Sequence, residues 1–149
     1  MTPLGLLDGI RVLDLGTEVS GPFCAKLLAD YGADVIKVEL PGLGDPSRRM
    51  GPFAGDDPNP EKSIPFLYIN TNKRGVTLDT RNPSGRGVLE ALLKTADVLV
   101  ENVPPAQASE LGLNYAGLTR NNPGLIVTSI TAFGQTGPYR DYSATDLVK

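Results

Sequence analysis

The hydrophobic positions in the first forty residues change period twice. Residues 10–15 form an aliphatic and β-branched run that ends at Gly16, which predicts a strand buried in a parallel sheet. Residues 23–32 predict a helix that stops at Gly32, with Phe23, Leu27, Leu28 and Tyr31 recurring at helical spacing. Residues 33–39 predict a second strand. Because a strand, a helix and a strand of these lengths make a right-handed crossover, the sequence predicts the start of a parallel α/β sheet.

The alternation continues after a long irregular segment. Residues 40–63 are rich in Pro, Gly and Asp and lack periodicity, and loops of this length are usually functional or disordered. The segment 66–70 is compatible with either a helix or a strand. Further along, the pattern predicts strands at 75–79, 97–101 and 125–130, a helix at 83–96 with Val88, Leu89, Leu92 and Leu93 on one face, and short helices at 104–111 and 115–121. We therefore predict an α/β fold with a doubly wound, mostly parallel sheet.

Composition places the chain among ordinary globular proteins. It has 149 residues, of which 40% are hydrophobic and 21% are charged, as expected for one compact unit. The net charge is −3 and neither sign is segregated, so we expect no binding to nucleic acid or to an anionic membrane surface. The sequence contains neither an export signal nor a run near the roughly 18 apolar residues of a membrane span.

Two rare residue types limit the chemistry. These residues include no histidine, which excludes Ser-His-Asp and Cys-His catalysis and histidine-dependent zinc sites among them, and we expect no metal. The single Cys24 permits no internal disulfide and favours a reducing, cytoplasmic location, and its place on the first helix favours packing over reactivity. Residues 146–149 are an apolar start without capping or turn residues, so we expect the chain to be truncated.

The loops after the strands are the candidate binding segments, because ligands of parallel sheets lie outside the carboxyl ends of the strands. The loop 16–22 leads into a helix N-terminus, which favours an anion, so it is either a phosphate loop or simply a tight turn. It lacks the glycine patterns of dinucleotide folds and P-loops. Glu39 ends the second strand where a dinucleotide fold places its ribose-binding acid, so an NAD-dependent oxidoreductase remains an alternative function. For Lys37 and Glu39 themselves, we favour solvated charges at a strand end.

Other polar residues after the strands have two interpretations each. Basic side chains gather at three places and either meet phosphate groups or are solvated on the surface. Asn102 either donates and accepts hydrogen bonds with a ligand or caps the turn into Pro104. The basic residues are Arg48 with Arg49, Lys73 with Arg74, and Arg81.

A succession of motifs runs through the chain in a fixed order. The motifs are residues 7–15, Ser20-Gly21-Pro22, 28–39, Pro41-Gly42, Gly44-Asp45, 72–79, 96–102 and 133–139. In this order and spacing they resemble the class III CoA-transferase family, which includes formyl-CoA and carnitine CoA-transferases and the related α-methylacyl-CoA racemase. The resemblance extends essentially from end to end.

The resemblance implies a Rossmann-like CoA-binding domain, here residues 1–149, as the N-terminal part of a larger, interlocked homodimer. It implies coenzyme A as co-substrate, no tightly bound cofactor, and an acyl-CoA and a small carboxylic acid as partners. Some members carry Arg where this chain has Leu40 and Glu110, so Arg81 and Arg48 become candidates for pairing with the CoA phosphates. The implied CoA-binding positions are Val19, Ser20, Leu40, Leu78, Asp79, Thr80, Arg81, Asn102, Val103, Pro104 and Asp146, the last within the stretch 143–146.

In transferase members an aspartate attacks the acyl-CoA thioester, forms a mixed anhydride and becomes an enzyme–CoA thioester. The resemblance places that aspartate after residue 149, and Asp146 matches a different family aspartate. We therefore name no catalytic residue in this chain and expect it to be inactive alone.

An acyl-CoA racemase is the alternative within the family. In racemases resembling this chain a histidine precedes the aspartate that matches Asp146, whereas this sequence has Thr145, which favours the transferase. An NAD-binding oxidoreductase domain and a non-catalytic nucleotide-binding or dimerisation module remain as alternatives from other classes.

Overall fold

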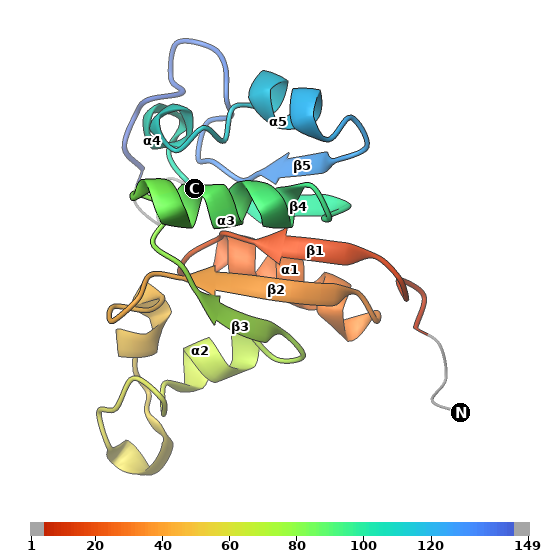
Figure 1. Ribbon diagram of the computed structural model, residues 1–149. Coiled ribbons are helices and arrows are strands. Elements are labelled where there is room, and N and C mark those ends of the chain that lie inside the picture. Colours follow the sequence, from red (N-terminus) through yellow and green to blue (C-terminus); the bar gives the residue numbers. More distant parts are fainter. Residues whose placement is uncertain (1–4, 145–149) are drawn as a thin grey trace.

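The computed structural model describes residues 5–144, which fold around one five-stranded sheet (Figure 1). All neighbouring strands are parallel, and their order is β3-β2-β1-β4-β5. The strand order reverses between β1 and β4, as in a doubly wound fold, which confirms the predicted fold class. The strands are β1 (Arg11–Asp14), β2 (Asp34–Glu39), β3 (Arg74–Thr77), β4 (Val98–Glu101) and β5 (Ile126–Ser129).

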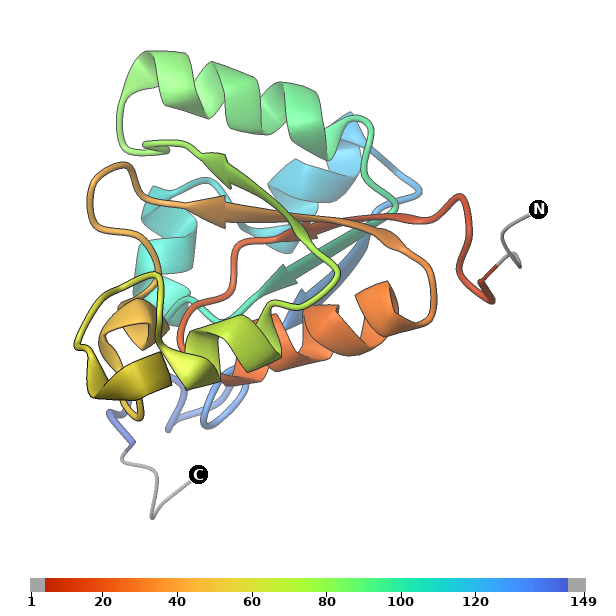
Figure 2. The same cartoon turned by 90° about the horizontal axis from the view of Figure 1, so that it is seen from below.

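Helices cover both faces of the sheet (Figure 2). Helices α1 (Ser20–Asp30) and α2 (Ile64–Ile69) lie on one face, and α3 (Pro83–Leu93), α4 (Pro105–Glu110) and α5 (Tyr115–Asn121) lie on the other. Successive residues of a strand point to opposite faces, so Val12 packs in the α1 cluster and Leu13 in the cluster beneath the other three helices. The sheet is therefore the middle layer between two apolar cores.

Side-chain caps fix where three of the helices begin. Asn82 accepts a hydrogen bond from the Gly85 amide at 2.7 Å and precedes Pro83, which suits the first position of α3. Asn114 caps α5 through the Gly117 amide at 2.8 Å. Residues 66–69 of the ambiguous segment belong to α2, with Asn70 as its C-cap, and the Ser63 hydroxyl accepts from the Phe66 amide at the start of the helix. These caps are local signals in the sequence, and the helix bounds follow them closely.

Helix α1 presents its small residues to the sheet, contrary to what its large apolar residues indicate. Its buried residues are Gly21, Pro22, Ala25 and Ala29. Phe23 and Leu27 on the helix and Tyr31 at its C-cap are 38%, 44% and 57% exposed. Small side chains let the helix approach the strands closely, and the larger ones then point outward. We call these three exposed side chains the outer α1 stripe.

The segment 40–63 is folded although it lacks periodicity. It contains two short 3-10 helices, η1 (Pro46–Arg49) and η2 (Ala54–Asp56). The buried Ser63 hydroxyl lies 2.7 Å from the carbonyl oxygens of both Ser47 and Met50, and Ser63 pairs with Phe53 in an antiparallel bridge. Polar contacts rather than an apolar face therefore hold this segment. Among the described residues, no helix has both the length and the apolar character needed to cross a bilayer.

Candidate functional site

The loops after β1 and β4 meet where the strand order reverses. The Asn102 side chain accepts a hydrogen bond from the Thr17 amide at 2.8 Å and donates to the Thr17 carbonyl at 2.8 Å. The same amide donates to the Ser20 hydroxyl at 3.1 Å. Ligands of doubly wound sheets bind at this position, outside the carboxyl ends of the strands. We therefore take this edge of the sheet as the candidate site.

The N-terminus of α1 opens onto this edge. Its N-cap residue is Val19, and within residues 5–144 no side chain caps it; its first turn also carries no acidic residue. The loop approaches the helix so closely that a Cβ atom on Gly16 would lie 2.7 Å from the Gly21 Cα, so both positions require glycine. An uncapped helix N-terminus suits an anionic group, because its amide groups and its dipole both favour negative charge.

A buried ion pair between Lys37 and Asp45 lies behind this loop. The Lys37 ammonium is 2.7 Å from Asp45 Oδ2, donates to the Gly16 carbonyl, and lies 4.0 Å from Asp14 Oδ2. Asp45 Oδ1 accepts from the Ser47 amide and hydroxyl at 2.8 and 2.6 Å and from the Glu18 amide at 3.1 Å. Burial opposes ionisation of Asp45, but Lys37 and Ser47 outweigh it and hold the pKa of the Asp45 carboxyl below its usual value.

A second buried pair joins Lys73 to Asp14 at the end of β1. The Lys73 ammonium donates to Asp14 Oδ2 at 2.8 Å, to the Pro22 carbonyl at 2.7 Å and to Asn70 Oδ1 at 2.8 Å. Asp14 Oδ1 accepts from the Gly16 amide at 2.9 Å. Burial lowers the pKa of Lys73, and the Asp14 carboxylate opposes that shift. This pair connects the end of β1 with the first turn of α1.

Glu39 and Arg48 form a third, two-point pair after β2. Arg48 donates to Glu39 Oε2 at 2.6 Å and to Oε1 at 2.8 Å, and its guanidinium lies 3.7 Å from the centre of the Phe66 ring. Glu39 also accepts from the Asp45 amide at 2.8 Å. The interpretation of Lys37 and Glu39 as solvated charges is therefore wrong, since both are buried. Arg48 also donates to Glu61 at 2.9 Å, so Glu39 and Glu61 both pair with its guanidinium.

The structure brings the implied CoA-binding residues to one edge of the sheet. Val19 and Ser20 lie at the start of α1, and Leu40 directly follows β2. Residues 78–81 follow β3 and residues 102–104 follow β4, so every described position comes after the carboxyl end of a strand. Asp146 and its neighbour Thr145 lie outside the described residues.

Arg81 is an exposed cation at this edge. Its side chain is 65% exposed, and its Nε donates to Asp79 Oδ1 at 2.8 Å. The Asp79 carboxylate also accepts from the Arg81 amide at 3.1 Å, and these bonds lower the pKa of Asp79. The two residues form a local, solvated pair from which the guanidinium can turn toward a ligand.

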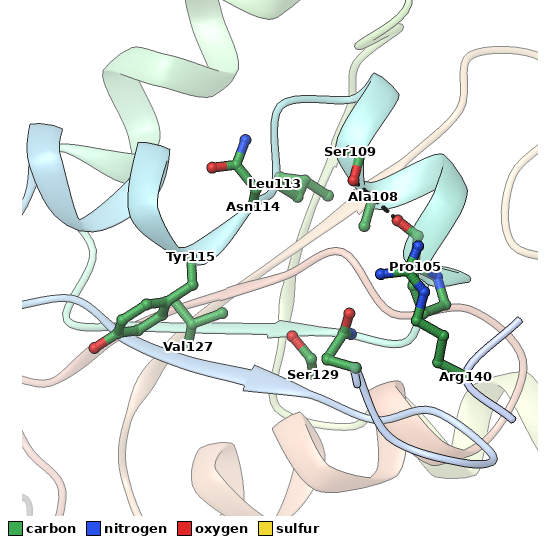
Figure 3. A pocket seen from close by; sticks show the side chains of 10 residues that line it. Pro105, Ala108, Ser109, Leu113, Asn114, Tyr115, Val127, Ser129 and Arg140 are labelled. Atoms are coloured by element: carbon green, nitrogen blue, oxygen red, sulfur yellow. Dashed lines mark hydrogen bonds between the residues drawn. The ribbon is translucent and has the colours of Figure 1, made fainter. Parts of the chain in front are cut away.

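A separate cavity of about 460 Å³ lies on the α4 side of the sheet (Figure 3). Its lining includes Ser129 on β5, Ser109 on α4, and Arg140 in the loop that follows β5.

Glu101 stands in register with Ser129 at the end of β4. Its Oε2 accepts from the Val103 amide at 2.7 Å, whereas its buried Oε1 has no hydrogen-bond partner among residues 5–144. In that same range, no three acidic or cysteine side chains come together as metal ligands.

Sequence reasoning missed most of the buried polar residues of this edge. Asp14 and Glu101 were not singled out, and Asp45 was named only within the Gly44-Asp45 motif. Lys73 was named as either a phosphate contact or a solvated charge, whereas its ammonium is buried against Asp14. A usable signal was present, because Asp14 and Glu101 are acidic residues at the last positions of β1 and β4, directly after apolar residues. Cys24 is partly buried, which agrees with packing, and burial raises the pKa of its thiol.

Comparison with known proteins identifies the family. The model of CoA-transferase family III matches residues 7–149. The succinyl-CoA–D-citramalate CoA-transferase of Chloroflexus aurantiacus is 44% identical over 135 residues, which cover 91% of this chain and 33% of that protein. A formyl-CoA:oxalate CoA-transferase of Rhodopseudomonas palustris (strain BisA53) is 50% identical over 135 residues, covering 91% of this chain and 31% of that protein.

Solved structures agree. A CAIB/BAIF family protein from Brucella suis superposes with a TM-score of 0.87 at 38% identity, over 97% of this chain and 38% of that one. The chain thus spans about a third of the length of the curated relatives that it matches. The extent of the family match and the shared fold together show that this chain belongs to CoA-transferase family III.

Proposed function

We propose that the protein is a CoA-transferase that moves CoA between an acyl-CoA and a small carboxylic acid, and that residues 1–149 are its N-terminal CoA-binding domain. The observation that carries this proposal is the switch point, where Asn102 joins the loop after β4 to the loop that precedes the uncapped α1 helix. Relatives named as transferases of succinyl-CoA and formyl-CoA support the same reaction class.

The edge offers a suitable partner for each part of the CoA nucleotide. The amide groups at the start of α1, near Val19 and Ser20, suit a phosphate. Arg81 supplies an exposed positive charge after β3. Leu40 and Leu78 are both partly buried, and the Leu78 amide donates to the carbonyl of Glu39, the residue before Leu40, at 2.8 Å. The two leucines offer apolar contact to a base. Residues 102–104 extend this surface across the switch point.

The reaction we propose needs a nucleophile beyond residue 149. An aspartate carboxylate attacks the thioester carbonyl, the carbon–sulfur bond breaks, and CoA leaves as a thiolate. The thiolate then attacks the aspartyl carbonyl of the mixed anhydride, which releases the donor acid and forms an enzyme–CoA thioester. The acceptor acid takes CoA by the reverse steps. Residues 1–149 bind and orient CoA in this scheme and form no covalent bond.

The proposal includes an interlocked homodimer and a cytoplasmic location. The outer α1 stripe supports the first, because three large apolar side chains on one helix would be covered in a larger assembly. The lone Cys24 supports the second, because it offers no internal disulfide. We propose CoA as a co-substrate and no tightly bound cofactor.

Two measurements on the full-length protein test this function. Isothermal titration with CoA should show saturable binding, and incubation of succinyl-CoA or formyl-CoA with a panel of carboxylic acids should yield a new CoA thioester, detected by mass spectrometry. NAD serves as the matched control ligand and should not bind. Saturable NAD binding, or the lack of CoA binding by a folded protein, would overturn the proposal.

A further inference from the structure

The loop between β1 and α1 contains a residue in an unfavourable backbone conformation. Glu18 has φ of 60°, in the left-handed region that residues with a Cβ rarely adopt. Such a conformation persists only where its surroundings hold it. Its own side chain is exposed and does not explain the geometry, so the cause lies in the groups that contact its backbone.

Side chains from three other segments hold the backbone of this loop. Asp45 Oδ1 accepts the Glu18 amide at 3.1 Å, and Lys37 donates to the Gly16 carbonyl. Asn102 holds both the amide and the carbonyl of Thr17 at 2.8 Å. Three consecutive residues are therefore fixed by side chains that are distant in sequence, immediately before the helix whose N-terminus opens onto the site.

The Lys37–Asp45 pair differs from Asn102 because it is shielded from solvent. Both residues are 2% exposed, so neither reaches a ligand at the sheet edge. Both carboxylate oxygens of Asp45 are already hydrogen-bonded. Oδ2 accepts from Lys37, and Oδ1 accepts from the amides of Glu18 and Ser47. Any effect of the pair on a ligand must therefore pass through the loop.

We infer that Asp45 and Lys37 are positioning residues of the CoA site: their buried pair sets the Gly16–Glu18 backbone and so aims the α1 N-terminus at the ligand. The inference rests on the proposed function for the identity of the ligand. If the loop adopts its competent arrangement in only about a tenth of the molecules, the apparent affinity falls about tenfold. Loss of Asp45 should therefore weaken CoA binding without removing any contact to CoA.

The decisive experiment uses Glu18 as a conformational reporter in the full-length protein. Asp45→Ala should raise the dissociation constant for CoA about tenfold. Asp45→Asn should have a smaller effect, because its amide oxygen still accepts the Glu18 amide, and it serves where the alanine variant does not fold. Adding Glu18→Gly to either variant should restore most of the affinity, because glycine adopts positive φ without a steric cost. A residue that only stabilises the fold would not be rescued in this way.

The exposed pair Lys62–Asp57 in the same irregular segment is the matched control. Asp57→Asn and Lys62→Met should leave CoA binding unchanged, whereas Lys37→Met should weaken it. Hydrogen exchange of the Glu18 amide gives a readout without CoA, and it should speed up in Asp45→Ala.

The outcomes separate the two proposals. Wild-type protein that does not bind CoA, together with faster exchange in Asp45→Ala, contradicts the proposed function and supports the positioning of the loop. Wild-type affinity in a folded Asp45→Ala protein, or a loss that Glu18→Gly does not reverse, overturns the positioning role.

Discussion

The Asn102 side chain pairs with both the amide and the carbonyl of Thr17, although 85 residues separate the two positions. This arrangement imitates the hydrogen bonding between neighbouring backbone segments and joins the two loops of the switch point just beyond the ends of β1 and β4. The arrangement of the proposed CoA site therefore includes a contact that is made by one side chain and one stretch of backbone.

Asn102→Ala should weaken both the fold and CoA binding. The substitution removes three hydrogen bonds, to the amide and carbonyl of Thr17 and to Ser20, of which water replaces a part. We expect a loss of about 1–2 kcal/mol in the free energy of unfolding and about tenfold weaker CoA binding. Urea unfolding and isothermal titration measure the two effects. Asn59→Ala, which removes only a local bond to the Glu61 amide, is the control and should bind CoA normally. Equal CoA affinity in both variants would show that the pair has no role in the site.

Arg81→Gln should lower the affinity for CoA mainly at low salt. The guanidinium is exposed and forms an ion pair with Asp79. Because it is exposed to solvent, added ions screen its attraction to a phosphate. About tenfold weaker binding is expected at low ionic strength, with the difference shrinking as salt is added. Arg74→Gln is the matched control, because Arg74 pairs with Asp34 at the opposite end of β3. Titrations at two salt concentrations that give the same ratio of affinities would contradict a direct charge interaction.

Acid should destabilise the fold through Asp45 and Glu39. Burial opposes ionisation of both, yet Lys37 and Ser47 lower the pKa of Asp45, and Arg48 lowers the pKa of Glu39. In the unfolded chain the pKa values return to about 3.9 for Asp and about 4.3 for Glu, so the unfolded chain binds protons more readily than the folded one as the pH falls. The stability from these pairs is thus complete above about pH 5 and is lost as the pH falls through the folded-state values. In urea unfolding from pH 6 to pH 3, Asp45→Asn should be less stable at pH 6 and show a flatter acid limb; a parallel limb would contradict the shift.

The separate stretch 1–149 should expose apolar surface. Phe23, Leu27 and Tyr31 lie along the outside of α1 and remain accessible in this chain. In the proposed larger assembly, other segments or the partner subunit cover them. We expect 1–149 to bind a hydrophobic dye more strongly and to aggregate more readily than the full-length protein. Leu27→Lys in 1–149 should reduce both signals. A monodisperse, cooperatively melting 1–149 with little dye binding would show that the stretch is an autonomous domain.

The order of elements was predictable because each is specified by nearby residues. The apolar run 10–15 contains β1, and the predicted helix at 115–121 has the bounds of α5, where Asn114 provides the cap. Four of the predicted strands extend one residue beyond the observed strand at one or both ends, whereas the predicted strand 75–79 starts one residue late and ends two residues late. The fold class follows from this local alternation and is confirmed by the parallel pairing.

The interior of the site was not predictable in the same way. Lys37 and Glu39 look like solvated residues in the sequence, since charged side chains are seldom buried without partners. Their partners, Asp45 and Arg48, lie in a segment without periodicity, and only the folded loop brings them within 3 Å. The helical spacing in α1 predicted the helix but not its buried face, because hydrophobicity marks which residues avoid water, whereas Ala25 and Ala29 are buried because they are small.

The last prediction separates a transferase from a racemase and depends on residue 145, which lies outside the described residues. A racemase removes the α-proton on one face of the substrate and delivers a proton on the other, which requires two acid–base groups near neutral pKa. Racemases resembling this chain carry a histidine where this sequence has Thr145, whose hydroxyl does not ionise near neutral pH. The full-length protein, given a chiral 2-methylacyl-CoA in deuterated water without an acceptor acid, should therefore incorporate no deuterium at the α-carbon at a catalytic rate. Thr145→His, which restores the racemase residue, is the comparison variant and tests whether this single position limits exchange. Rapid α-proton exchange by the wild-type protein would instead identify it as a racemase.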